Sequence, residues 1–269
     1  MSGVFVLRLS KNKFSVAGAF FSCLLLSASL FAEGGGSRFT LRFPDTYSAG
    51  EAIELRNLAS ASLAILNESS QEYSRILGTS PKRGVTVELV KGRIRIGESF
   101  APEWTSAVFY RGKIIIPTNS RPTMSELRRT LRHEYAHAVI AELSASRCPA
   151  WLDEGLAQYL EGEINPRLGP ALRRLISSGS AFSLSDLREG FFSMAEGDAA
   201  SAYAQSLFVT RNLINSSGFG GLRKYLRSLS KGMNYERAFS SAFGISQRSY
   251  ERRLTPLIRR WAKSGRRNP

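Results

Sequence analysis

Histidine and cysteine are both scarce in this chain of 269 residues, which holds two of each. Two cysteines cannot build the disulfide framework that stabilises many small secreted domains. The chain also lacks a repeat of fixed period and any long low-complexity tract, so it does not have the pattern of a repeat protein. With 43% apolar and 22% charged residues, the composition allows one or two domains with a hydrophobic core.

Acidic side chains are also in short supply, with 22 Asp and Glu against 37 Lys and Arg, which gives a formal charge of +15. Residues 246–269 hold eight of the basic residues and one acid, Glu251. This basic C-terminus predicts weak, salt-sensitive association with anionic surfaces of the cell envelope. A solvated helix face that keeps the protein soluble accounts for the same charge. We find no nucleic-acid-binding motif and expect no specific nucleic-acid binding.

Residues 1–32 have the pattern of a secretory signal. Three basic residues between positions 8 and 13 precede an apolar run over 14–32, and three glycines follow at 34–36. We therefore expect an exported protein that is periplasmic, secreted or anchored to the membrane. Cleavage after Ser29 or after Ala32 fits the pattern, and an uncleaved N-terminal anchor is the alternative because the run is long enough to span a bilayer.

Hydrophobic periodicity predicts where strands and helices lie along the rest of the chain. The expected strands cover residues 38–43, 84–90 and 107–116. The expected helices cover residues 49–77, 123–144 and 149–160, and the pattern beyond Pro166 is helical with breaks near Gly179, Gly190, Gly218 and Gly244. This order predicts an α+β fold. We expect residues 38–269 to form a single domain, with a strand-containing N-terminal lobe to about residue 145 and a helical C-terminal lobe from about residue 146.

The segment His133-Glu134-Tyr135-Ala136-His137 lies on the expected helix over 123–144, which begins with a capping box at Thr123 and Glu126. Residues four apart on a helix lie one turn above each other, so both imidazoles point to one side. Neutral imidazole is a good zinc ligand, and two of them supply half of a four-coordinate shell. Glu134 lies about 100° around the helix, where it can take a proton from a water bound to the metal.

A third protein ligand cannot be histidine, because none remains. Cys148 or a carboxylate is left, and Glu154 is the strongest candidate. It lies near the start of a helix that follows a short turn, and helices joined in this way pack antiparallel. The sequence therefore predicts one Zn²⁺ per chain, held by His133, His137 and Glu154. Manganese or cobalt can occupy the same ligand set in vitro.

These motifs resemble those of the gluzincins, metallopeptidases with an HExxH helix and a downstream glutamate ligand. Residues 151–155, Trp-Leu-Asp-Glu-Gly, are similar to the W-L-N-E-G signature of aminopeptidase-type gluzincins, with Asp153 where Asn is usual and a shorter gap from the second histidine. The closer likeness is to small bacterial peptidase-MA-like domains, which share a G-K/R-I-x-x-P strand (112–117 here) and an A-Y-A-Q-S helix (202–206 here). It covers about residues 38–262 and implies a zincin-like fold with zinc-peptidase chemistry.

The resemblance also implies a residue that stabilises the oxyanion of the reaction. Aminopeptidase-type gluzincins use a tyrosine in this role, and Tyr203 occupies the matching helix. A core tyrosine that only packs the helix is the alternative. Tyr159 and Arg211 are the other candidates for the role.

Two further roles follow from position. Gln158 and Glu161 lie four and seven residues after Glu154 on the same helix face, and either is placed to accept the free ring N–H of a ligand histidine. In the resembling peptidases an edge strand pairs with extended peptide, which implies this role for the strand over 107–116. Burial of residues 114–116 inside a sheet is the alternative.

The sequence as a whole predicts an enzyme, a zinc-dependent peptidase that hydrolyses bonds in peptide or protein substrates with Glu134 as general base. A zinc hydrolase of non-peptide amides or esters has the same motifs and stays open. So does a catalytically silent, zinc-bound scaffold or binding protein of the envelope, although an intact Glu134 argues against it. The sequence does not indicate the oligomeric state.

Overall fold

The structure is a computed structural model that describes residues 30–34, 37–44, 48–101, 105–119, 122–162, 165–179, 181–191, 194–264 and 269. The chain forms two compact units, one of residues up to 71 with 81–131, the other of residues 72–80 with 132–269. Helices α1 (Ala49–Leu77) and α2 (Met124–Ser144) each contribute to both units. The single domain with a lobe boundary near residue 145 stays a prediction.

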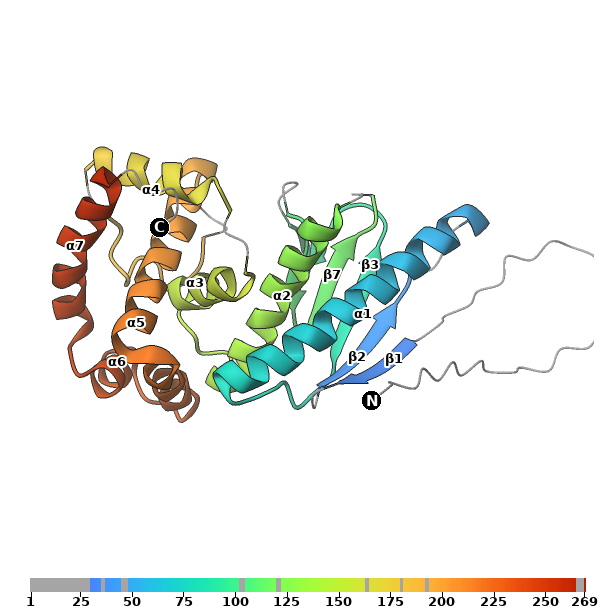
Figure 1. Ribbon diagram of the computed structural model, residues 1–269, viewed down its shortest axis with the longest axis horizontal. Coiled ribbons are helices and arrows are strands. Elements are labelled where there is room, and N and C mark those ends of the chain that lie inside the picture. The colour runs from blue at the N-terminus through green and yellow to red at the C-terminus, as the bar shows by residue number, and fades with distance from the viewer. Residues whose placement is uncertain are drawn as a thin grey trace, which may run out of the picture. The chain divides into compact units, whose positions relative to one another are not determined.

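The first unit is built on a sheet whose central strands are parallel. Its strands follow the order β1 (Leu30–Gly34), β2 (Ser37–Arg42), β3 (Val85–Val90), β7 (Lys113–Pro117) and β6 (Val108–Tyr110). β2, β3 and β7 run parallel, while β1 and β6 pair antiparallel at the two sides. Alternate side chains of the central strands are buried, among them Phe39, Val87 and Ile114. In Figure 1, α1 crosses one face of this sheet, as the connection between the parallel strands β2 and β3 requires.

The expected strands over 38–43 and 84–90 are confirmed as β2 and β3. The single strand expected over 107–116 is wrong, because β6 and β7 form a hairpin in that segment. Its turn residues Arg111 and Gly112 have φ values of 48° and 79°, the left-handed conformation that a tight two-residue hairpin turn requires. A second, two-stranded sheet joins β4 (Arg95–Ile96) to β5 (Ser99–Phe100).

The expected signal segment lies outside the described residues except for its last three positions. Those positions belong to β1, which pairs with β2 from Leu30 to Gly34. Within the described part of the chain, no helix combines the length and the apolarity that a bilayer crossing needs.

The second unit is helical. It contains α3 (Ala150–Leu160), α4 (Leu168–Ser177), α5 (Glu196–Ser230), α6 (Tyr235–Phe243) and α7 (Gln247–Lys263) in addition to the ends of α1 and α2. The long helix α5 packs against α3, α4 and α6. It bends at Gly218, where φ is 61°, and α6 ends at Gly244 in the left-handed conformation. The predicted α+β class, with strands first and helices after, is confirmed.

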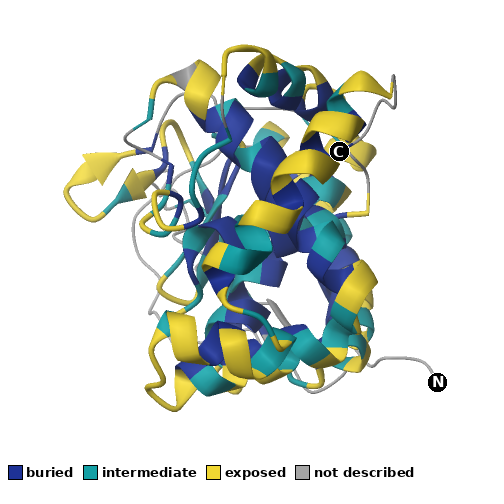
Figure 2. Cartoon of the chain, turned by 90° about the vertical axis from the view of Figure 1, so that its left-hand side faces the viewer, coloured by how far each residue is buried: buried dark blue, intermediate teal, exposed yellow. Residues whose placement is uncertain are grey.

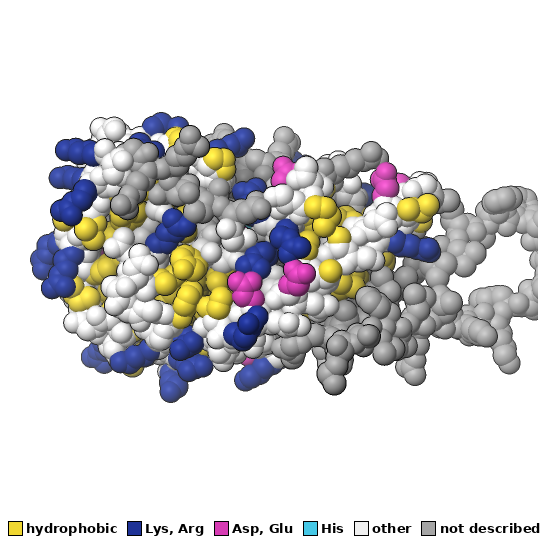
Figure 3. All heavy atoms as spheres, viewed as in Figure 1, with side chains coloured by type: hydrophobic (Ala, Val, Ile, Leu, Met, Phe, Trp, Pro, Cys, Tyr) yellow, Lys and Arg dark blue, Asp and Glu magenta, His cyan; other side chains and the backbone are white. Residues whose placement is uncertain are grey.

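Helix α7 of this unit is amphipathic and buries one of its faces. α7 buries Leu254, Ile258 and Trp261, while most of its basic residues are exposed. Figure 2 shows this alternation as buried and exposed faces of the same helices, and Figure 3 shows Lys and Arg gathered over α7. The basic C-terminal segment predicted from the sequence is therefore a solvent-facing helix surface over its described part.

Candidate metal centre

Helix α2 carries both histidines of the chain. It begins at the expected capping box, where the backbone N–H of Thr123 donates to Glu126 Oε2 at 2.8 Å. His133 and His137 lie one turn apart on the helix, and their ring centroids are separated by 4.9 Å. Both rings therefore project from the same side of α2, as the i, i+4 spacing predicts.

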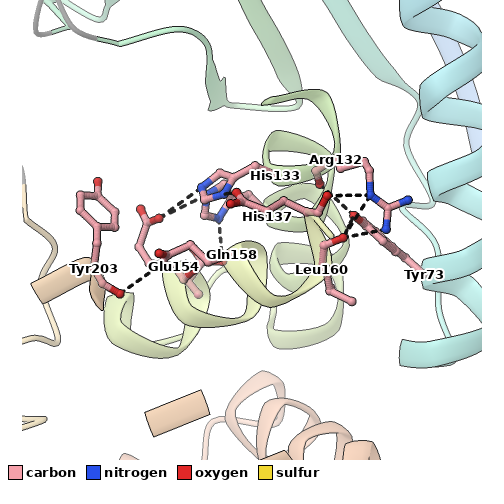
Figure 4. A network of polar contacts seen from close by, with 10 residues as sticks. Tyr73, Arg132, His133, His137, Glu154, Gln158, Leu160 and Tyr203 are labelled. Atoms are coloured by element: carbon pink, nitrogen blue, oxygen red, sulfur yellow. Dashed lines mark hydrogen bonds and ion pairs between the residues drawn. The ribbon is translucent and has the colours of Figure 1, made fainter. Parts of the chain in front are cut away.

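A short turn after α2 brings α3 back against the histidines. Ala145 and Ser146 take positive φ values of 51° and 57°, which reverse the chain within a few residues. Pro149 caps α3 in an extended conformation. Glu154 lies in the second turn of α3, and Figure 4 shows its carboxylate directed at the two imidazoles.

The three side chains form a set of donors with the separations of a metal site. Glu154 Oε2 lies 3.4 Å from His133 Nε2 and 3.8 Å from His137 Nε2. One ligand atom from each residue lies within 4.8 Å of the other two. Tetrahedral zinc with bonds of about 2.0–2.1 Å places its ligand atoms about 3.4 Å apart, close to these values. Glu154 Oε2 is buried and accepts no hydrogen bond among the described residues, so a cation would satisfy it.

Each histidine is held from behind by a carboxylate. His133 Nδ1 lies 2.8 Å from Glu161 Oε2, and His137 Nδ1 lies 2.9 Å from Asp153 Oδ1. A proton on each Nδ1 leaves the lone pair of each Nε2 directed toward Glu154, the tautomer that ligation requires.

Of the two positions expected to orient a histidine, the structure places Glu161 there and Gln158 elsewhere. Gln158 Nε2 donates to the backbone oxygens of Glu154 and Tyr203, at 3.1 and 3.0 Å. The sequence analysis missed Asp153. Its signal was available, since two ligand histidines need two acceptors and Asp153 directly precedes the ligand glutamate.

The surrounding carboxylates shift the pKa of both histidines. Burial alone would lower the pKa of His137, but the charges of Asp153 and Glu154 outweigh it and raise that pKa to about 9. Burial of His133 is likewise outweighed by the carboxylates of Glu154 and Glu161 beside its two ring nitrogens, which put its pKa well above the usual value. Burial opposes the ionised form of Glu154, yet the two imidazoles lower its pKa. The carboxylates around the two histidines thus favour a positively charged group next to Glu154.

Gly155 lets α5 approach the residue next to the candidate ligand. A Cβ atom at this position would lie 2.2 Å from Thr210 Oγ1 and 2.3 Å from the backbone oxygen of Ser206, distances that no real contact allows. The backbones of α3 and α5 therefore touch at Gly155, and only glycine fits there.

Glu134 and Tyr203 both interact electrostatically with residues of the same site. Glu134 is buried, and its charge contributes to the raised pKa of His133. Burial raises the pKa of Tyr203, and the charges of Glu154 and Glu134 raise it further, which keeps the phenol protonated near neutral pH. Figure 4 shows Tyr203 beside Glu154, and its ring packs edge-on against Phe191 with centroids 5.0 Å apart.

The other candidates for these roles make different contacts. The ring of Tyr159 packs edge-on against Phe219 with centroids 5.8 Å apart, and Arg211 donates to the backbone oxygen of Pro269. Cys148, the alternative third ligand, lies 3.6 Å from the backbone oxygen of Pro149, and burial raises the pKa of its thiol well above the usual value. Among the described residues, the group of donors close enough to hold one ion contains Glu154 and does not include Cys148.

Comparison with known proteins places this chain in a family. A search of curated proteins finds no match. Among solved structures, the chain is similar to an aminopeptidase N family protein from Idiomarina loihiensis, with 14% identity and a TM-score of 0.43 over 82% of this chain and 42% of that one. The chain thus spans less than half the length of that relative. A family model of the peptidase MA superfamily matches residues 29–259, nearly the whole chain. The predicted resemblance to gluzincin-type peptidases is confirmed, and the chain belongs to the peptidase MA superfamily.

Proposed function

We propose that this protein is a zinc-dependent peptidase whose metal is held by His133, His137 and Glu154. The family supports hydrolysis of peptides or proteins. The observation that carries the proposal is the buried Oε2 of Glu154, which accepts no hydrogen bond from the described residues and lies 3.4 and 3.8 Å from the two Nε2 atoms. Two imidazoles and one carboxylate are the ligand set of zinc hydrolases that keep one position open.

Zinc bound there supplies a Lewis acid that activates water and polarises the scissile carbonyl. Asp153 and Glu161 keep the two imidazoles in the ligating tautomer. Glu134 accepts the proton of the attacking water and passes it to the leaving nitrogen as the peptide bond breaks. Tyr203 donates a hydrogen bond to the developing oxyanion, and its raised pKa keeps that proton on the phenol.

The proposal also covers the cellular location of the enzyme and the way in which it binds an extended substrate. The pattern of residues 1–32 supports export, and the exposed basic residues of α7 support weak attraction to anionic envelope surfaces. β6 lies at an edge of the sheet, where an extended substrate can add as a further strand.

A peptide-library digest tests the function. The chain from Leu30, where β1 begins, is loaded with zinc and compared with Glu134→Gln by mass spectrometry of the products. We expect cleavage by the wild type alone, with equal zinc content in both proteins, because Glu134 is a proton acceptor rather than a ligand. Silence from the zinc-loaded wild type would contradict the peptidase proposal. Turnover of simple esters or amides in its place would assign a non-peptide hydrolase.

A further inference from the structure

Arg132, the residue directly before His133, grips the end of helix α3. Its Nε donates to the backbone oxygens of Leu160 and Glu161 at 3.2 and 3.1 Å, and its Nη2 donates to Leu160 O at 2.8 Å. The last carbonyls of a helix have no partner within the helix and carry its negative end. A guanidinium placed there satisfies both the hydrogen bonds and the charge.

Two residues of α1 fix the guanidinium in this place. Arg132 Nη1 lies 2.7 Å from Glu72 Oε2, and the guanidinium carbon lies 5.3 Å from the ring centre of Tyr73. The hydroxyl of Tyr73, a fully buried residue, donates to Leu160 O at 2.7 Å. Leu160 O therefore accepts from both side chains, and the Arg132 side chain is only 14% exposed. Figure 4 shows this network on the far side of the histidines from Tyr203.

The contact between Arg132 and the end of α3 affects the metal centre because two consecutive residues of α2, Arg132 and His133, both contact Glu161. Its backbone oxygen accepts from Arg132, and its side-chain Oε2 lies 2.8 Å from His133 Nδ1. Gly162 follows with φ of 89° and turns the chain away, so no further helical turn of α3 supports Glu161. Within α3 the backbone N–H of Glu161 donates to Ala157 O, and from outside the helix the contact with Arg132 fixes its backbone oxygen and so helps to place the carboxylate behind His133.

We propose that Arg132 is a positioning residue of the metal centre, which acts through Glu161 to set the orientation of His133. The inference rests on the proposed zinc site and names the device that aligns one of its ligands. Loss of the grip lets Glu161 move, and the His133 ring then loses its fixed tautomer and direction. The His137 and Asp153 pair has no part in this route.

The test measures metal binding directly, without substrate. Arg132→Met is compared with Arg128→Met, a matched control: Arg128 lies one turn earlier on α2 and pairs with Glu68 of α1 in the same way. Zinc affinity is measured by competition with a chromogenic chelator, and the visible spectrum of bound Co²⁺ reports ligand geometry. We expect Arg132→Met to weaken zinc binding by about tenfold and to shift the Co²⁺ bands, as loss of a group that orients a ligand does. Arg128→Met should leave both unchanged.

Two further variants make the result specific. Arg132→Lys keeps the charge but not the fork of donors, so we expect it to recover part of the affinity. In the Glu161→Gln background, Arg132→Met should have little further effect, because both changes act on one contact. If Arg132→Met does not fold, Glu72→Gln replaces it, with an expected loss of about threefold from a less fixed guanidinium.

Unchanged zinc affinity and an unchanged Co²⁺ spectrum in folded Arg132→Met would overturn this inference while leaving the zinc site intact. Full additivity with Glu161→Gln would do the same. A folded wild type that binds no zinc would overturn the proposed function together with it.

Discussion

The carboxylate of Glu161 lies behind His133, on the ring nitrogen opposite the one that faces Glu154. His133 is thus placed between two glutamates of one helix, seven residues apart, which lie on the same face of α3. One carboxylate is available to a metal, and the other sets the direction of the imidazole. The same division holds for His137, with Asp153 as the orienting group.

Replacing an orienting carboxylate by its amide should weaken metal binding without removing a ligand. We expect Glu161→Gln and Asp153→Asn each to reduce zinc affinity by about 10–100-fold, because an amide accepts a weaker hydrogen bond and carries no charge. Competition with a metal chelator measures the change. Glu189→Gln, at an exposed position, is the control. Affinities equal to the wild type would show that these contacts do not tune the ligands.

The raised histidine pKa values predict opposite pH trends for the zinc-depleted and the zinc-loaded protein. The pKa of His137 is about 9 in the folded chain, above about 6.5 for a free histidine. A raised pKa contributes stability that is fully present below about pH 6.5 and is lost as pH rises through about 9. We therefore expect the Tm of EDTA-treated protein to fall between pH 6.5 and 9.5.

Zinc should reverse that trend, because it binds neutral imidazole and displaces protons. The rise in Tm on adding zinc should grow with pH over the same interval, and calorimetry in buffers of different ionisation enthalpy should detect proton release. Asp153→Asn, which removes the largest charge raising the His137 pKa, should flatten the dependence in the zinc-depleted protein. A Tm that rises with pH after EDTA treatment would contradict the assignment.

A methyl group at Gly155 should disturb both the fold and the site. The Cβ would meet Thr210 Oγ1 and the Ser206 backbone oxygen at less than 2.5 Å, so α3 and α5 must separate. We expect Gly155→Ala to lower the free energy of unfolding by about 1–3 kcal/mol, the usual cost of overpacking. Urea denaturation measures it. Gly220→Ala on α5, where a Cβ would meet nothing within 4 Å, is the matched control and should be neutral or slightly stabilising.

Removal of the Tyr203 hydroxyl should separate catalysis from metal binding. We expect Tyr203→Phe to lower kcat by about 10²–10³-fold, the cost of losing one oxyanion donor, while zinc affinity stays unchanged. Its ring contact with Phe191 is kept, so the fold is preserved. Steady-state kinetics on a substrate found in the library digest measures the effect. Unchanged turnover would assign Tyr203 to packing alone.

The sequence predicts the parts of this site that depend on local geometry. The i, i+4 spacing on a capped helix brings His133 and His137 to one side, and the short turn to α3 makes Glu154 the best third donor. The choice between Gln158 and Glu161 depends on how far α3 is rotated about its own axis, which spacing alone does not determine. Asp153 is a different case, because the need of two ligand histidines for two acceptors already pointed to a second carboxylate beside Glu154.

The hairpin of β6 and β7 shows a different kind of limit. Arg111 and Gly112 form its turn, but arginine has no preference for the left-handed conformation that it adopts there. Consecutive apolar and aromatic residues lie on both sides of the turn, so the segment has the composition of one buried strand. β1 was overlooked because its first residues have the apolar composition of the signal segment.

The paired contacts of Arg132 and His133 with Glu161 also fix the register between α2 and α3. Arg132 donates to the backbone oxygen of Glu161, and His133 contacts its side-chain carboxylate. A shift of α3 along α2 would therefore break both contacts together. A slip of one helical turn, about 5.4 Å, would also carry Glu154 away from the imidazoles. The helix pair therefore has one alignment in which both contacts to Glu161 form, and in that alignment the three donors converge.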